Sequence, residues 1–186
     1  MPKLTLAKAK EILKKTTTEK HLFQHAAAVS AAMGAMAEHF GADRDYWAAV
    51  GYLHDVDYEK YPEEHCHHVR ELLAGEDVDE EAIRAIISHG YGLTGVEEKP
   101  ESDLEKSLYT VDELTGIVEA YALMRPTHFD GMTVKSFKKK YKDKRFAAGC
   151  NREVINEGFA MLGMEPADVM SIVIKGMSEH QEELGF

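Results

Sequence analysis

The sequence predicts an all-α protein, a single-domain bundle of packed helices. Apolar residues recur along the chain with the spacing of one helical face, and no stretch shows the strict alternation or turn residues of a β-hairpin. Residues that start and stop helices divide the chain into segments of ordinary helix length. With 186 residues the chain is long enough to bury its own core, so one domain spanning 1–186 is the simplest organisation.

The first three predicted helices are delimited by short polar residues and glycine. Thr5 can cap a short first helix, and the alanine-rich second helix begins at a threonine cluster and ends at Gly41. Asp43 or Asp45 then opens a third helix that runs to about His54.

Two further helices and a long loop follow. Pro62 suits the first turn of a helix that ends near Gly75, and Asp79 can cap a helix that ends at residues 88–90. The glycine-containing loop 90–100 is close to the upper length of a structureless connection, so we expect a lid or a binding loop there.

The remaining helices are predicted by the same signals. Ser102 or Asp103 can cap a long helix that runs to about Met124, where an Arg-Pro pair ends it. After a basic segment, helices are expected at about 152–163 and from Pro166 onward.

Composition restricts the class of protein. No apolar run approaches the length of a membrane span, and the N-terminal residues lack the apolar core of a secretory signal. Cys66 and Cys150 are the only cysteines, too few for a disulfide framework. We therefore expect a cytoplasmic protein without a membrane partner, and the oligomeric state is not predicted.

The charge is unevenly distributed. A net charge of −11 argues against binding of a nucleic acid polymer. Residues 133–145 nevertheless contain seven basic residues and a single acid, which is either a solvated helix face or a clamp for an anionic substrate. For the clamp, the candidate substrate-binding residues are Lys144, Arg145 and Arg152, which flank the small-residue stretch FAAG.

Several imidazoles and a carboxylate are in register with the apolar faces of their helices. The buried side of a helix recurs every three or four residues, so a polar residue at that spacing points into the core. The residues that meet this criterion are His25, His54, His65, His68, His89 and Asp112.

One such histidine is more simply explained as a satisfied core residue, but an inward carboxylate is costly unless it is paired or bound to a cation. Taken together with Asp55 beside His54, these residues predict a metal site with nitrogen and oxygen ligands. Such a ligand set suits zinc, iron, manganese or nickel.

The order of these residues has a known counterpart. His25, then His54-Asp55, then Asp112 resembles the H…HD…D signature of the HD-domain metal-dependent phosphohydrolase superfamily, over about residues 18–125. The stretches HDVDYEKYPEEH, ISHG, LYTVDELTG and KKKYKDKRFAAGCNRE resemble a group of small HD proteins. The resemblance implies packed helices with the metal between them, a metal-binding core at 18–125 and a helical extension at 126–186.

The resemblance also implies a ligand set. His25, His54, Asp55 and Asp112 match the four core ligands, and two-metal members add two histidines, which His65 and His89 match best. His68 is the alternative to His65. One or two divalent ions are implied (Fe, Mn, Zn or Ni, with Mg possible), and Asp55 is the expected bridge between two.

The expected activity is metal-dependent hydrolysis of a small phosphorylated metabolite or nucleotide through a metal-bound hydroxide. The catalytic candidates are Asp55, Asp112, which could position or deprotonate the water, and Asp57, an outer-shell partner or general acid. Tyr58 stands where single-metal nucleotidase members carry an acid, so the subfamily stays open. The alternatives are a di-iron oxygenase of the HD type and a non-catalytic regulatory module that retains a metal.

Overall fold

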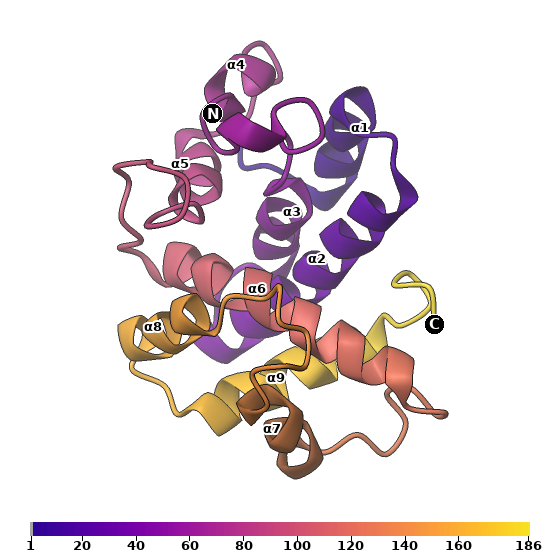
Figure 1. Cartoon of the computed structure of the whole chain (residues 1–186). Helices are drawn as coiled ribbons and strands as arrows, with labels where there is room; N and C mark the ends of the chain where they lie inside the picture. Colours follow the sequence, from indigo (N-terminus) through magenta and orange to yellow (C-terminus); the bar gives the residue numbers. More distant parts are fainter. Residues whose placement is uncertain (1) are drawn as a thin grey trace.

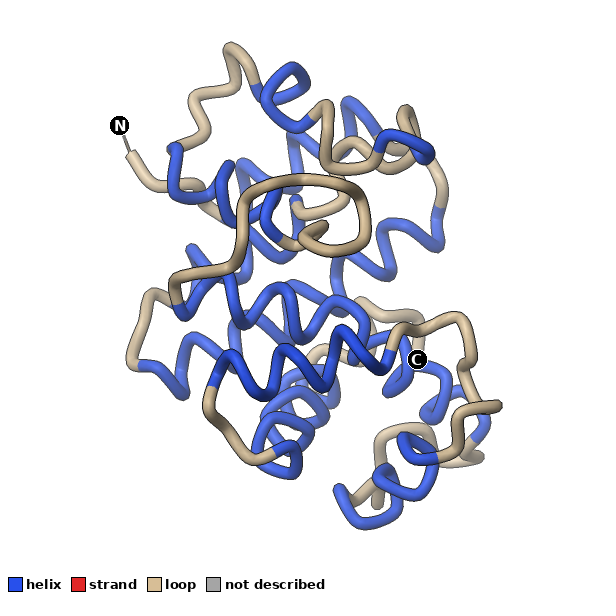
Figure 2. Tube along the Cα trace, turned by 60° about the vertical axis from the view of Figure 1, so that its left-hand side comes forward, coloured by secondary structure: helices blue, strands red, loops and turns tan. Residues whose placement is uncertain are grey.

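The computed structural model describes residues 2–186, and this part of the chain consists of helices and loops without a strand (Figure 2). The predicted all-α class is therefore confirmed. The helices are α1 (Leu6–Thr16), α2 (Lys20–Phe40), α3 (Arg44–Leu53), the 3-10 helix η1 (Pro62–Glu64), α4 (Val69–Leu73), α5 (Glu80–Ser88), α6 (Asp103–Met124), α7 (Val134–Lys142), α8 (Arg152–Leu162) and α9 (Pro166–Glu179).

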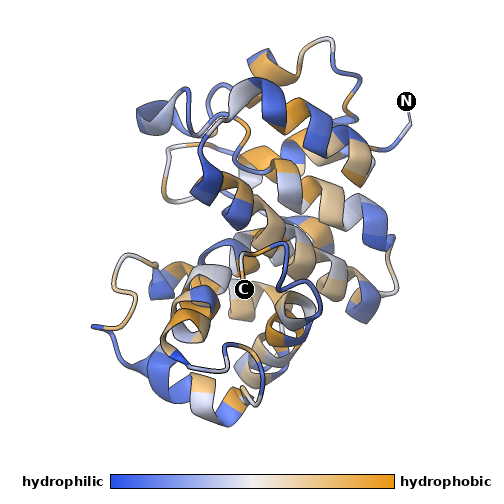
Figure 3. Cartoon of the chain, turned by 90° about the vertical axis from the view of Figure 1, so that its right-hand side faces the viewer, coloured by the Kyte–Doolittle hydropathy of each residue, from blue (hydrophilic) through white to orange (hydrophobic). Residues whose placement is uncertain are grey.

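Helix α2 lies at the centre of the bundle (Figure 1). It contacts α3, α6 and α9, while α1 packs on α3 and α8 packs on α6. Every residue from Ala26 to Ala37 is buried, so neighbouring parts of the chain cover most of the surface of this stretch. Figure 3 shows that apolar stretches gather where the helices face one another.

Two glycines allow neighbouring helices to approach α2 closely. A Cβ atom on Gly51 of α3 would lie 2.9 Å from the carbonyl oxygen of Val29, and one on Gly176 of α9 would lie 2.8 Å from that of Ala31. Because α2 carries His25 and α3 leads into His54, the first of these contacts fixes the spacing of two predicted ligands.

The cap residues resolve two alternatives that the sequence left open. Asp43, not Asp45, caps α3 by accepting the Tyr46 N–H. Ser102 caps α6 and forms a reciprocal capping box with Glu105. Asp79 caps α5, as predicted.

The prediction of one continuous helix over 62–75 is wrong. The chain forms η1, then turns over 65–68, then the short α4. Cys66 has a φ of 74°, and the backbone N–H of His68 donates to the carboxylate of buried Asp57 at 3.1 Å instead of to a helix carbonyl. A buried acceptor outside the segment therefore replaces the helical hydrogen bond, and His65 and His68 do not share a helical face.

No helix within residues 2–186 combines the length and the apolar character needed to cross a bilayer. The long loop between α5 and α6, predicted from its composition, is present without regular structure beyond a few turns (Figure 2).

Candidate metal centre

Six side chains from separate parts of the fold meet between α2, α3, α5 and α6. Helix α2 supplies one, the end of α3 supplies two, and the turn after η1, the end of α5 and the middle of α6 supply one each. These side chains are His25, His54, Asp55, His65, His89 and Asp112.

Four of the six form a first group of donor atoms. The Nε2 atoms of His25 and His54 are 3.1 Å apart, and they lie 3.0 and 3.1 Å from Oδ1 of Asp112. Oδ2 of Asp55 lies 3.4 and 3.3 Å from the same two nitrogens. Donor atoms about 3.4 Å apart are what tetrahedral bonds of about 2.1 Å to one ion require.

A second group shares the Asp55 carboxylate. The Nε2 atoms of His65 and His89 are 3.1 Å apart, and Oδ1 of Asp55 lies 3.1 and 3.5 Å from them. Oδ2 of Asp112 is 3.9 Å from His89 Nε2. Asp55 thus presents one oxygen to each pair of imidazoles, which is the arrangement of a carboxylate between two ions.

The Nδ1 atoms of three imidazoles are held by hydrogen bonds that leave Nε2 facing the centre. His54 bonds the Gly51 carbonyl oxygen at 2.7 Å, and His89 bonds that of Ile86. His65 bonds Oδ1 of Asp57 at 2.7 Å. Such partners select the tautomer in which Nε2 carries the lone pair for a metal.

Asp57 acts on the cluster through His65. Its side chain is fully buried, and it accepts hydrogen bonds from His65 and from the backbone N–H groups of Cys66 and His68. Burial alone would raise the pKa of Asp57, but these hydrogen bonds outweigh burial and lower it. The carboxylate is therefore ionised and turned away from the centre, so the general-acid role considered for it does not fit this geometry.

The electrostatics of the cluster favour bound positive charge. Burial would raise the pKa of both Asp55 and Asp112, but the facing imidazoles, His54 above all, lower both pKa values. Burial would lower the pKa of His54, but the two carboxylates raise it to about 9. The ionised carboxylates therefore favour positive charge at this position, which either protonated imidazoles or a divalent ion can supply. Nε2 atoms that have given up their protons would bind such an ion together with the carboxylate oxygens.

Cys66 lies beside the second pair of imidazoles. Its sulfur lies 3.8 Å from Nε2 and 3.9 Å from Nδ1 of His89. A sulfur and a nitrogen bound to one ion at about 2.3 and 2.1 Å lie about 3.6 Å apart, so Cys66, His65 and His89 form a further group that could hold a metal ion. The burial of Cys66 against His89 is a contact that helical periodicity did not predict.

His68, the alternative to His65, lies outside the cluster. Its Nδ1 and Nε2 atoms lie 2.6 and 3.1 Å from carboxylate oxygens of Glu71 and Glu64, and its ring stacks on Tyr61. Both ring nitrogens are therefore engaged with surface carboxylates.

Arg152 has a structural position that the sequence did not predict. Its guanidinium donates to backbone carbonyl oxygens on both sides of the turn before α8, at 2.6 to 3.4 Å, and so is not free to bind a substrate. The acceptors are the carbonyls of Lys140, Tyr141, Asp143, Phe146 and Ala147.

The segment between α7 and α8 passes in front of α6 in Figure 1. The backbone N–H of Asn151 donates to Glu113, the neighbour of Asp112, at 3.2 Å. Lys144 and Arg145 lie on this segment and are exposed; the Arg145 side chain is 94% accessible. The segment therefore carries two solvated cations and is tied to α6 at the residue after Asp112.

Sequence reasoning missed Glu119, seven residues after Asp112 on α6. Burial raises the pKa of its carboxyl to about 7, although the nearby His25 acts in the opposite direction. Helical periodicity could have identified it, because Glu119 lies two turns after Asp112 and therefore shares its helical face.

Comparison with known proteins gives one match. A family model described as "HD domain" matches residues 22–117, more than half of the chain. No curated protein and no solved structure matches the chain significantly.

Proposed function

The chain belongs to the HD-domain superfamily of metal-dependent phosphohydrolases, and on this premise we propose that it hydrolyses a phosphate ester of a small metabolite or nucleotide. The observation that carries the proposal is the pair of donor groups that share Asp55. A carboxylate that directs one oxygen at each of two pairs of imidazoles suits a site with two ions. Two-ion sites are typical of phosphate-ester hydrolysis.

A bound divalent ion supplies a Lewis acid, which lowers the pKa of water and neutralises negative charge on a phosphate. The chain's own residues perform the remaining tasks. Asp57 and the carbonyls of Gly51 and Ile86 hold three imidazoles in their ligating tautomer. Asp112, whose Oδ2 lies farther from the imidazole nitrogens than Oδ1, is proposed to position the attacking water.

Lys144 and Arg145 are the proposed contacts for the phosphate. Both are solvated cations on a segment that is tied to α6 beside Asp112. Among residues 2–186 the one ion pair of Arg145 is with the carboxylate of Asp143, at 3.6 Å, and its side chain is exposed, so its guanidinium can turn to a substrate. Arg152 supports them by holding the segment.

The test is phosphate release from a panel of phosphomonoesters, phosphodiesters and nucleotides, by chelated protein and by protein loaded with iron, manganese, zinc, nickel or magnesium. We expect release only from loaded protein, loss of activity in His65→Ala and retention in the matched variant His68→Ala. Oxygen consumption by iron-loaded protein without phosphate release would favour the di-iron oxygenase. Metal binding without turnover across the panel would favour the regulatory module.

A further inference from the structure

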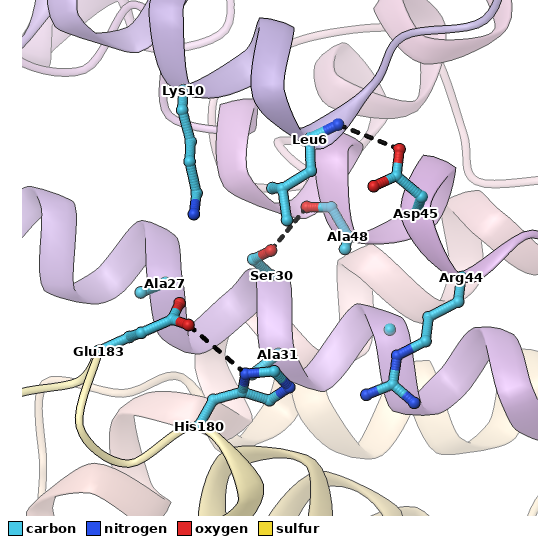
Figure 4. A pocket seen from close by; sticks show the side chains of 11 residues that line it. Leu6, Lys10, Ala27, Ser30, Ala31, Arg44, Asp45, Ala48, His180 and Glu183 are labelled. Atoms are coloured by element: carbon cyan, nitrogen blue, oxygen red, sulfur yellow. Dashed lines mark hydrogen bonds and ion pairs between the residues drawn. The ribbon is translucent and has the colours of Figure 1, made fainter.

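A groove lies on the side of α2 that faces away from the metal centre. Ala27, Ala31 and Gly34 are about half a turn around the helix from His25. With Ala48 of α3 they form the floor of a cavity of about 330 Å³, and α1 and the chain after α9 form its walls (Figure 4).

The small side chains of the floor leave space for a ligand above them. The floor is apolar, because the hydroxyl of Ser30 is used in a hydrogen bond to the backbone. Ser30 donates to the Ala48 carbonyl oxygen at 2.9 Å. A Cβ on Gly34 would lie 3.4 Å from Nε of Arg44, so the arginine lies close against the floor at one end. A hydrocarbon group placed here would bury apolar surface without stranding a polar atom.

The cavity continues into a second hollow of about 540 Å³, with which it shares Lys10, Ala27 and Glu183. The second hollow adds Lys14, Lys20 and Glu182 to its lining. We call the two adjoining hollows the groove: the alanine floor lies in one part, and three lysines with Glu182 and Glu183 line the other.

The three lysines lack acidic partners. Lys15 pairs with Glu76 at 2.8 Å, whereas Lys10, Lys14 and Lys20 have no carboxylate within 4.0 Å among residues 2–186. Nζ of Lys10 lies over the Tyr52 ring, 5.7 Å from its centroid.

Apart from Glu182, which also lines the second hollow, the other charged groups on the rim are engaged. Arg44 pairs with Glu38, and His180 lies 3.7 Å from Glu183. Asp45 accepts the Leu6 N–H at 3.2 Å. In a chain with a net charge of −11, unpaired cations grouped around a hollow are a local site of attraction for an anion.

We propose that this groove binds a small amphipathic anion, an aliphatic carboxylate, with its hydrocarbon chain on the alanine floor and its carboxylate among Lys10, Lys14 and Lys20. Figure 4 shows Lys10 extending from α1 toward α2, over the floor. The hydrocarbon part would lie on the alanine floor of the first hollow, and three lysines against Glu182 and Glu183 leave net positive charge for a carboxylate in the second. None of the six residues of the metal centre lines the groove, so the site stands apart from the proposed hydrolysis.

The test is calorimetric titration of the full chain with decanoate, below its micelle-forming concentration, with and without metal. We expect saturable binding of one decanoate per chain that is unaffected by chelation. Lys10→Ala should weaken it about tenfold, and the matched variant Lys8→Ala, on the same helix but outside the groove, should not. Ala27→Leu, which fills the junction of the two hollows, should abolish binding, and a thermal melt shows whether this variant is folded.

Three results would overturn the proposal. The first is the absence of saturable binding by the native chain. The second is equal binding of decanoate and decanol, which would indicate an apolar cavity without anion recognition. The third is equal weakening in Lys10→Ala and Lys8→Ala. All three are independent of phosphate hydrolysis.

Discussion

Replacing Asp57 with asparagine tests how the second pair of imidazoles is held. The wild-type carboxylate is fully buried and accepts from His65 Nδ1 at 2.7 Å and from the His68 N–H at 3.1 Å. Asparagine has a single acceptor oxygen, so its amide N–H group must face one of these donors. His65 would then lose either its orientation or the negative charge that strengthens Nε2 as a donor.

The expected magnitude follows from this loss. Removing the partner of a ligating histidine typically costs 10- to 100-fold in metal affinity, which is roughly 1.4–2.8 kcal/mol. Asp57 contacts His65, which is paired with His89 in the second group of donor atoms. The loss of affinity should therefore fall on the ion of that group. The ion among His25, His54 and Asp112 should keep its affinity.

The assay is equilibrium dialysis against buffered free metal, with elemental analysis of the protein. Wild type should retain two ions per chain, and Asp57→Asn should retain one at concentrations where wild type holds both. Glu64→Gln is the matched control, because it makes the same chemical change beside His68 outside the cluster. Two ions bound by Asp57→Asn with unchanged affinity would refute the positioning role of Asp57.

Three further predictions concern the rest of the site. Because burial raises the pKa of Glu119 from 4.5 to about 7, folding favours its protonated form, and the stability that this contributes is lost as the pH rises through 7. Glu119→Gln should therefore raise the free energy of unfolding by about 2 kcal/mol at pH 8 and change it little at pH 4, as measured by urea denaturation; an equal effect at both pH values would contradict this. Arg152→Met should lower the stability by about 2–3 kcal/mol, because several carbonyls lose a charged donor, and it should speed proteolysis of the segment between α7 and α8; an unchanged cleavage rate would show that the clasp is dispensable. The double substitution Lys144→Ala, Arg145→Ala should leave the melting temperature unchanged and raise KM for the substrate about tenfold or more, and an unchanged kcat/KM would exclude both as phosphate contacts.

Helical periodicity explains why most of the site could be predicted from sequence. His25, His54, His89 and Asp112 lie on or at the end of regular helices, so their spacing from apolar residues indicated their direction. The helix ends were also predictable, since capping depends on residues that are neighbours in the sequence.

The segment 62–68 could not be predicted by the same reasoning. Its backbone follows hydrogen bonds to Asp57, a residue before the segment whose burial depends on the whole fold. Periodicity placed His65 and His68 on one helical face, whereas the turn separates them and brings Cys66 against His89.

The role of Arg152 was hidden for a related reason. Composition identified a basic segment, but it could not show that one of the cations would bind backbone carbonyls within that segment. The groove behind α2 was equally invisible, because it needs α1, α2 and the chain after α9 to be placed side by side.

The account depends most on two ions being shared through Asp55, and anomalous X-ray scattering from a crystal of the metal-loaded protein tests this directly. We predict two peaks, one among His25, His54 and Asp112 and one between His65 and His89, with one Asp55 oxygen directed at each. A peak bound by other residues, or full metal loading with no peak between these side chains, would contradict it.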